Sequence, residues 1–257
     1  MSFKVVIPAR YGSTRLPAKP LLPIAGRPMI QWVVEQACRS QADEVLVATD
    51  DARIAAVIAD PPGRRHVQAV MTRADHASGT DRIAEVARAR RWSGDTVVVN
   101  VQGDEPQMPP VLIDQVAALL ASDPRADLAT LCTPVTGDDE FTNPNIVKVV
   151  RAADGNALYF SRAPIPFDRD ASGPAAEPSP RHAGAFRHLG IYAYRVDALL
   201  RMTALPVSPL EAREKLEQLR ALEAGMRIAV GIASQVPGVG VDTHEDIERL
   251  RSEVGAR

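Results

Sequence analysis

The chain has 257 residues, of which 46% are hydrophobic, and a formal net charge of -2. This length suits one large α/β domain, and the lack of a basic excess argues against a protein that wraps a nucleic-acid backbone. No apolar run approaches the roughly 20 residues of a membrane helix, and the first residues lead into a strand pattern rather than a signal peptide. We therefore expect a cytoplasmic protein with neither a nucleic-acid nor a membrane partner.

The first 135 residues alternate apolar runs with amphipathic segments. The runs are rich in valine and isoleucine and lack polar alternation, which is typical of strands covered on both faces. They span 3–7, 44–49, 66–71, 96–101 and 127–135. Helical three- and four-residue spacing of apolar positions is found in 28–39, 52–59, 80–90 and 111–121. The alternation predicts an α/β fold: a Rossmann-like, mainly parallel sheet flanked by helices.

The pattern changes after about residue 136. Further strands are predicted at 145–150, 157–161, 188–194 and 227–232, and helices at 210–224 and 244–254. Residues 163–187 are crowded with proline, glycine and alanine, which predicts a long loop or arm. We interpret residues 1–257 as one domain in which residues 137–205 are a candidate insertion for a subunit contact or a sugar contact.

The segment from Pro8 to Pro20 follows the first strand, where parallel sheets bind ligands. Arg10, Arg15 and Lys19 supply three fixed cations, and Gly12 frees backbone N–H groups, which together suit a triphosphate. The segment lacks the glycine patterns of P-loop and dinucleotide-binding proteins. For any single cation a solvated surface loop is the better interpretation, but three cations within ten residues, held by Pro17 and Pro20 at a strand end, favour phosphate binding.

Asp104 follows the strand at 96–101 and so lies at the same edge of the sheet. Mg²⁺ prefers oxygen ligands and takes one or two carboxylates, with water and phosphate completing its shell. Asp104 fits this need, although a turn residue before Pro106 is an equally good interpretation of the local pattern. Asp242 precedes a predicted helix, where helix capping is favoured by pattern alone. No H-E-x-x-H motif occurs, so we do not expect zinc.

Several blocks of the sequence together resemble the 3-deoxy-manno-octulosonate cytidylyltransferase family. They are 10–20, 71–76, 78–82, 99–106, 143–145, 159–162, 187–192 and 241–243, whereas 171–185 has no counterpart. The resemblance implies a homodimeric, Mg²⁺-dependent nucleotidyltransferase of lipopolysaccharide synthesis. It would transfer CMP from CTP to the anomeric hydroxyl of 3-deoxy-manno-octulosonate (Kdo) and release pyrophosphate.

The resemblance also implies roles for individual residues. Catalysis is assigned to Arg10, Arg15, Lys19 and Asp104, and nucleotide binding to Pro8, Ala9, Arg10, Ser13, Arg15, Lys19, Ser78 and Gly79. The metal ligands are Asp104 and Asp242, and the sugar-binding residues are Gln102, Arg162, His188, Tyr192, Glu217 and Gln218.

Each of these side chains also has a purely structural interpretation. Ser78 would ordinarily cap a helix, and Arg162, which suits bidentate binding of a carboxylate, could simply end a strand. His188 and Tyr192 share one face of a predicted strand, where Tyr192 could equally pack in the core. The charged helix that carries Glu217 would otherwise be solvated.

Other functions remain open at this point. A cytidylyltransferase for another acidic sugar, such as a sialic acid, and a non-catalytic nucleotide-binding module are the main alternatives. A glycosyltransferase is compatible with the fold, but the one D-x-D motif, at 168–170, lies in the predicted arm. No side chain stands out as a general base, so metal-assisted deprotonation of the sugar is preferred.

Overall fold

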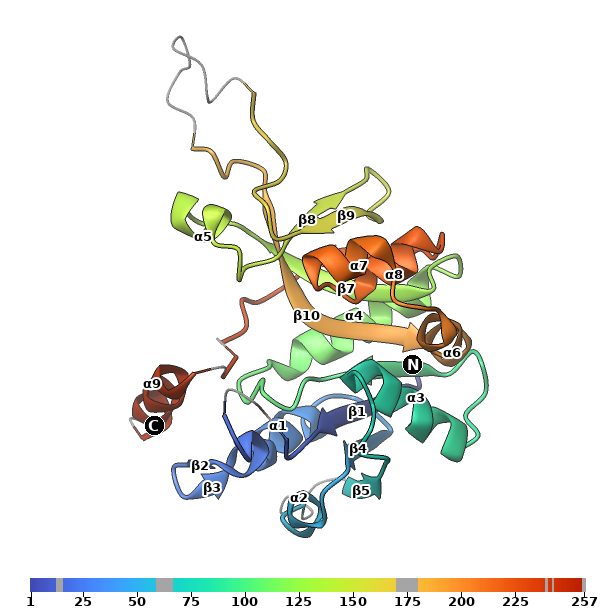
Figure 1. The fold of residues 1–257 in the computed structure, drawn as a ribbon, viewed down its shortest axis with the longest axis vertical. Helices are drawn as coiled ribbons and strands as arrows, with labels where there is room; N and C mark the ends of the chain where they lie inside the picture. Colours follow the sequence, from blue (N-terminus) through green and yellow to red (C-terminus); the bar gives the residue numbers. More distant parts are fainter. Residues whose placement is uncertain (13–15, 59–66, 170–179, 239, 242, 256–257) are drawn as a thin grey trace.

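A computed structural model describes the whole chain except residues 13–15, 59–66, 170–179, 239, 242 and 256–257. The described strands form a central sheet in the order β11-β7-β10-β6-β1-β4-β5 (Figure 1). The bounds are β1 Lys4–Ala9, β4 Glu44–Thr49, β5 Val67–Met71, β6 Val97–Asn100, β7 Leu128–Pro134, β10 Phe186–Arg195 and β11 Ile228–Ile232. All neighbours in this path are parallel except β10, which is antiparallel to both β6 and β7. The predicted mainly parallel α/β sheet is confirmed.

Helices cover both faces of this sheet. They are α1 Met29–Cys38, α2 Ala52–Ala56, α3 Gly79–Ala89, α4 Pro110–Ser122, α5 Asp138–Thr142, α6 Val196–Ala204, α7 Pro209–Glu214, α8 Gln218–Glu223 and α9 His244–Gly255, with a short 3-10 helix η1 at Lys19–Leu21. Val5 and Ile7 pack in one core with α1 and α4, whereas Val6 packs in a second core with α3, α6 and α8. Burial on both faces explains why the strands are apolar without alternation.

Two smaller strand pairs complete the described sheets. Strands β8 (Lys148–Arg151) and β9 (Ala157–Ser161) form an antiparallel pair that extends from the first residues of β10. Strands β2 (Pro23–Ile24) and β3 (Arg27–Pro28) form a separate hairpin. The described parts of the predicted arm, up to residue 169 and from residue 180, form no strand or helix before β10 and extend away from the sheet (Figure 1). The insertion assigned to 137–205 stays a prediction, although the central strand β10 lies within it.

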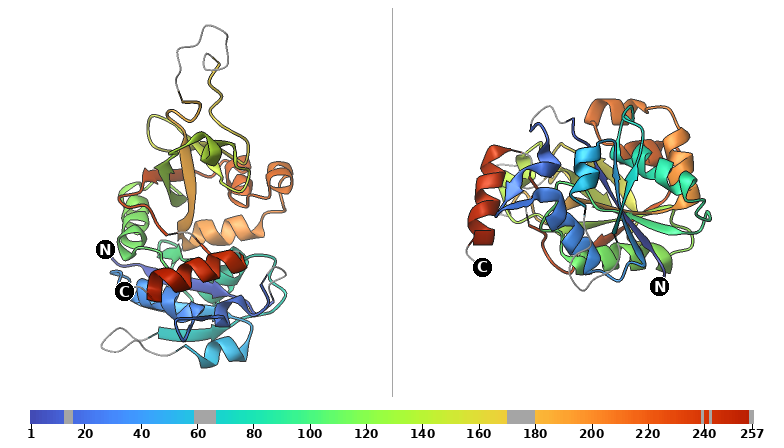
Figure 2. Two further views of the ribbon diagram at one scale, coloured as in Figure 1. Left: turned by 90° about the vertical axis from the view of Figure 1, so that its left-hand side faces the viewer. Right: turned by 90° about the horizontal axis from the view of Figure 1, so that it is seen from below.

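The C-terminal helix α9 packs against the beginning of the chain (Figure 2). Ile247 and Leu250 of α9 and the preceding Val241 share a small buried cluster with Leu16, Ile24 and Met29. This cluster joins the two ends of the sequence beside the first loop. None of the described helices is both long enough and apolar enough to cross a membrane.

One predicted element is wrong. The sequence predicts a single helix at 210–224, but the structure has two short helices, α7 and α8, separated at Lys215. Lys215 has left-handed backbone angles, with φ 55° and ψ 44°, which end α7. The break turns the chain so that Glu217 is the N-cap of α8 and Gln218 is buried. The structural interpretation of this segment as a solvated helix is therefore wrong for Gln218, which is buried.

Candidate active site

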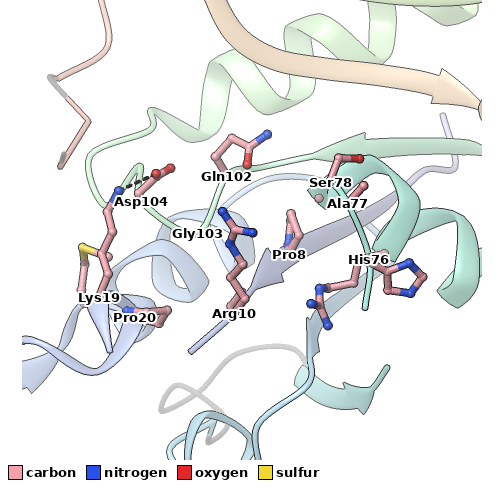
Figure 3. Close-up of a pocket in the computed structure, with 14 residues that line it drawn as sticks. Pro8, Arg10, Lys19, Pro20, His76, Ala77, Ser78, Gln102, Gly103 and Asp104 are labelled. Carbon is pink, nitrogen blue, oxygen red and sulfur yellow. Dashed lines mark hydrogen bonds and ion pairs between the residues drawn. The ribbon is translucent and has the colours of Figure 1, made fainter. Parts of the chain in front are cut away.

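A first cavity, of about 230 Å³, lies at the carboxyl ends of β1 and β6 (Figure 3). Val6 of β1 pairs with Asn100 of β6 in parallel register, so the segments that follow the two strands meet at one edge of the sheet. The start of α3 supplies a further wall. The cavity brings together the predicted residues Pro8, Ala9, Arg10, Lys19, Ser78, Gly79, Gln102 and Asp104. Ser13 and Arg15 lie outside the described residues.

Gly103 allows the segments after β1 and β6 to lie in contact. A Cβ atom at Gly103 would lie only 2.8 Å from the carbonyl oxygen of Pro8. At Gly79, a Cβ would lie 3.1 Å from Cγ of Pro8. Any larger side chain at Gly103 must therefore displace backbone, which explains the glycine that follows Gln102.

Lys19 and Asp104 form an ion pair at one side of this cavity (Figure 3). Lys19 Nζ donates to Asp104 Oδ2 at 2.6 Å, and the lysine side chain is 12% exposed whereas the aspartate side chain is 40% exposed. Pro20 occupies the first turn of η1, which holds Lys19 in place. The pair neutralises a carboxylate that would otherwise repel a phosphate group, and it keeps both side chains at the cavity.

The surroundings of Asp104 fit a magnesium ion. Asp104 is a partly exposed carboxylate beside Lys19, in the same cavity as Arg10. It offers an oxygen ligand of the kind that Mg²⁺ uses, next to cations that suit a phosphate group. The described residues hold no group of three or more His, Cys, Asp or Glu side chains arranged for a metal. Asp242 lies outside the described residues, but the N–H of the preceding Val241 donates to the carbonyl of Asp104 at 2.9 Å. The residue that directly precedes Asp242 in the sequence is therefore in contact with the backbone of Asp104.

Ser78 caps helix α3, as its structural interpretation predicts. Its Oγ accepts from the N–H of Asp81 at 3.1 Å, and the carboxylate of Asp81 accepts from the N–H of Ser78, which completes a capping box. The cap fixes the first turn of α3 against the cavity. The assigned contact of Ser78 and Gly79 with the nucleotide base stays a prediction.

Two further side chains of the first cavity were missed. Arg82 is buried and donates to the carbonyl of Arg73 and to Asp50, both at 3.2 Å. The ring of His76 contacts the carboxylate of Glu85. Burial opposes ionisation of Glu85, but the contact with His76 and the N–H of Arg73 outweigh it and lower the pKa of Glu85. These interactions hold the side chains of Arg82 and His76 in place in the wall of the first cavity.

A second cavity, of about 210 Å³, shares Gln102 with the first. It brings together the predicted sugar residues Gln102, His188, Tyr192, Glu217 and Gln218. Thr80, Asn100 and Tyr194 also line it and were not predicted. Among the described lining residues there is neither lysine nor arginine. The second cavity therefore suits a ligand group rich in hydroxyls better than a second phosphate.

Arg162 is not among the residues that line either cavity. Its Nη1 donates to the carbonyl of Pro144 at 2.9 Å and its Nε to the carbonyl of Glu214 at 2.7 Å. The guanidinium thus holds two chain segments together in this structure. The predicted contact with a sugar carboxylate stays a prediction, and it would have to use the guanidinium protons that these two carbonyls leave free.

Glu217 connects the two cavities. Its Oε1 accepts from Ser78 Oγ at 2.8 Å, and its Oε2 accepts from Thr80 Oγ1 at 2.5 Å. Ser78 lines the first cavity, whereas Thr80 and Glu217 line the second. Burial raises the pKa of Glu217, because removal from water disfavours the charged form. The two hydroxyl donors partly offset this cost.

Two buried polar atoms of the second cavity have no partner among the described residues. They are Asn100 Oδ1 and Tyr192 Oη, and their residues pair across β6 and β10. Burial also raises the pKa of Tyr192 well above its usual range, so its hydroxyl stays protonated. Because buried polar atoms nearly always have hydrogen-bond partners, these two atoms fit a cavity that takes a polar ligand.

The comparisons with known proteins agree with this geometry. The protein family described as cytidylyltransferase matches residues 4–228. The 3-deoxy-manno-octulosonate cytidylyltransferase of Nitrosococcus oceani is 53% identical over 252 residues, which cover 98% of this chain and 96% of the relative. That of Cellvibrio japonicus is 55% identical over 259 residues, covering 99% and 100%.

A solved structure gives the same result. It is CMP:2-keto-3-deoxy-manno-octonic acid synthetase complexed with CTP, which matches with a TM-score of 0.86 and 42% identity over 99% of this chain and 98% of that chain. Because these matches cover nearly the whole chain, they extend over the segments that line both cavities. The chain belongs to the 3-deoxy-manno-octulosonate cytidylyltransferase family.

Proposed function

We propose that this chain transfers CMP from CTP to the anomeric hydroxyl of Kdo and forms CMP-Kdo and pyrophosphate. The observation that carries the proposal is the pair of cavities that share Gln102. The first contains cations and a carboxylate, whereas the described residues that line the second include hydroxyl-binding groups and neither lysine nor arginine. A nucleotide in the first cavity and a sugar in the second would have their reacting groups near Gln102. Proximity of this kind is a major source of rate acceleration.

The triphosphate is assigned to the first loop. Arg10 and Lys19, with Ser13 and Arg15, would bind the phosphates, and the segments at Pro8–Ala9 and Ser78–Gly79 would surround the base. The anomeric hydroxyl then attacks the α-phosphorus while the bond to pyrophosphate breaks, and the hydroxyl loses its proton to water. The fixed cations stabilise the negative charge that grows on the leaving pyrophosphate.

We propose that Mg²⁺ is the cofactor and that Asp104 and Asp242 hold it. The support is the exposed carboxylate of Asp104 beside the phosphate-binding cations and the contact between Val241 and Asp104. An ion bound there supplies electrophilic polarisation of the α-phosphate. If Asp104 holds the ion, Lys19 would be available to a phosphate oxygen.

The sugar is assigned to Gln102, His188, Tyr192, Glu217 and Gln218, with Arg162 as the candidate for its carboxylate. Neutral acceptors and the carboxylate of Glu217 suit sugar hydroxyls, which donate hydrogen bonds. A homodimeric assembly and a cytoplasmic location are proposed on the family resemblance.

Pyrophosphate release tests the proposal. The purified protein is incubated with Mg²⁺, either CTP or UTP, and a panel of sugar acids that includes Kdo and a sialic acid. We expect turnover with CTP and Kdo. Turnover only with UTP would refute the cytidylyl assignment, and turnover only with sialic acid would favour the alternative sugar. Binding of CTP without turnover of any sugar acid would favour a non-catalytic module.

A further inference from the structure

Thr130 lies on β7 opposite an irregular part of β10. Leu189 of β10 pairs with Leu131 of β7, but the next paired residue, Tyr192, faces Thr130. The register therefore leaves residues 190–191 of β10 without partners on β7, as in a β-bulge. Backbone carbonyls in such a bulge need donors from outside the strand ladder.

The hydroxyl of Thr130 meets three polar atoms in this bulge. Its Oγ1 lies 2.7 Å from the carbonyl oxygen of Ile191, 3.1 Å from that of Leu189 and 3.0 Å from Nε2 of His188. Thr130 is 0% exposed, so its hydroxyl has no contact with bulk water. The contacts among these four residues therefore involve the one proton of the Thr130 hydroxyl and any proton that Nε2 of His188 carries.

Counting the protons assigns the direction of each bond. A hydroxyl has one proton and two lone pairs, and a carbonyl can only accept. If Thr130 gives its proton to the nearer carbonyl, of Ile191, then Nε2 of His188 must donate its own proton to Oγ1. The reverse arrangement would place two carbonyl oxygens against a hydroxyl oxygen with no proton between them. The first arrangement leaves only the more distant carbonyl, that of Leu189, without this proton, whereas the second leaves both carbonyls without it, so the first is favoured.

The ring of His188 carries only one proton at neutral pH. Burial lowers the pKa of His188 to about 3, so a proton on Nε2 leaves Nδ1 without one. The ring packs edge-on against Phe160, with ring centres 5.0 Å apart, and against Tyr192 at 5.3 Å, which limits its rotation. His188 lines the second cavity, and Nδ1 is the ring nitrogen that Thr130 does not use.

We propose that Thr130 is a positioning residue that fixes His188 as the Nε2–H tautomer and so presents Nδ1 to the second cavity as a hydrogen-bond acceptor. The ligand group at this point must then be a donor, such as a sugar hydroxyl, and an ionised carboxylate is disfavoured there. The assignment of the tautomer does not depend on the reaction. The assignment of a sugar hydroxyl as the donor to Nδ1 rests on the proposed function.

Nitrogen NMR of the ligand-free protein tests the tautomer directly. Protonated and unprotonated imidazole nitrogens have well separated ¹⁵N shifts, and the chain has only five histidines, so a His188→Gln sample identifies the signals. We expect the Nε2–H form in the wild type, a mixture of tautomers in Thr130→Val and the Nε2–H form again in Thr130→Ser, which keeps the hydroxyl. An Nδ1–H wild type, or a tautomer unchanged in Thr130→Val, overturns the proposal. If Thr130→Val does not fold, as judged by circular dichroism, the wild-type spectrum decides.

Steady-state kinetics test the positioning role. Loss of one hydrogen bond to the sugar predicts a KM for Kdo about tenfold higher in Thr130→Val, with the KM for CTP unchanged and Thr130→Ser close to wild type. Equal effects on both substrates would mean that Thr130 only supports the fold, which overturns the role. A wild-type protein without turnover would instead refute the proposed function, while the NMR result on the tautomer would stand.

Discussion

Replacement of Thr80 by valine tests whether the side chain of Glu217, which accepts from Ser78 and Thr80, is ionised in the folded protein. Valine keeps the shape of threonine but removes the hydroxyl that donates to Glu217 Oε2 at 2.5 Å. A hydrogen bond to a charged acceptor is worth about 1.5–3 kcal/mol, so we expect the free energy of unfolding at pH 8 to fall by about 2 kcal/mol. For a chain of this size, that loss corresponds to a Tm lower by roughly 4–8 °C.

The dependence of this effect on pH follows from the raised pKa of Glu217. A carboxyl group whose pKa is higher in the folded protein favours folding fully below its unfolded pKa, and this contribution is lost as pH rises through the folded pKa. At pH 8 the buried carboxylate depends on its two donors, whereas near pH 4.5 it is mainly protonated and loses less when one donor is removed. The destabilisation by Thr80→Val should therefore be larger at pH 8 than near pH 4.5.

Urea unfolding at both pH values measures the difference, with Thr80→Ser as the matched control. Serine loses the buried methyl group but keeps the donor, so it should retain the pH dependence of the wild type. A Thr80→Val protein as stable as wild type at pH 8, or equally destabilised at both pH values, would refute the reasoning.

Three further predictions concern residues that line the two cavities. Asp104→Asn should lower kcat/KM roughly hundredfold or more, because it removes the proposed metal ligand; retention of most activity at saturating Mg²⁺ would exclude that role. Gly103→Ala places a Cβ 2.8 Å from the carbonyl of Pro8 and should cost about 1–3 kcal/mol of stability in urea unfolding, with weaker CTP binding by calorimetry; an unaffected protein would mean that the segments separate easily. Because the pKa of His188 is about 3, kcat/KM for Kdo should show no histidine ionisation between pH 5 and 8; a step near pH 6.5 that His188→Gln abolishes would contradict this.

Sequence reasoning located the first cavity because its residues follow parallel strands. Any residue just after β1 or β6 must lie at the same edge of the sheet, so Arg10 and Asp104 could be placed together without knowledge of side-chain contacts. The direction of β10 could not be predicted in this way. An apolar run looks the same in a parallel and an antiparallel strand, and only the path of the preceding segment sets its direction.

The missed residues have a common character. Thr80, Asn100 and Thr130 are polar side chains buried in helix or strand segments that otherwise read as core. A polar residue inside a strand covered on both faces needs a partner, so Asn100 and Thr130 could have been selected by that rule. The break at Lys215 carries no comparable signal, because the residues around it are good helix formers. Nor does the sequence indicate that carbonyls of Pro144 and Glu214 occupy the guanidinium of Arg162.

The cluster between α9 and the first loop has a consequence for synthesis of the chain. Leu16 and Met29 are made early, but their partners Val241, Ile247 and Leu250 are made only after β11. A nascent chain that stops after β11 would contain every described strand of the central sheet, yet would lack the packing that closes over Leu16. The packing that covers Leu16, beside the first loop, can therefore form only after every described strand of the central sheet has been made.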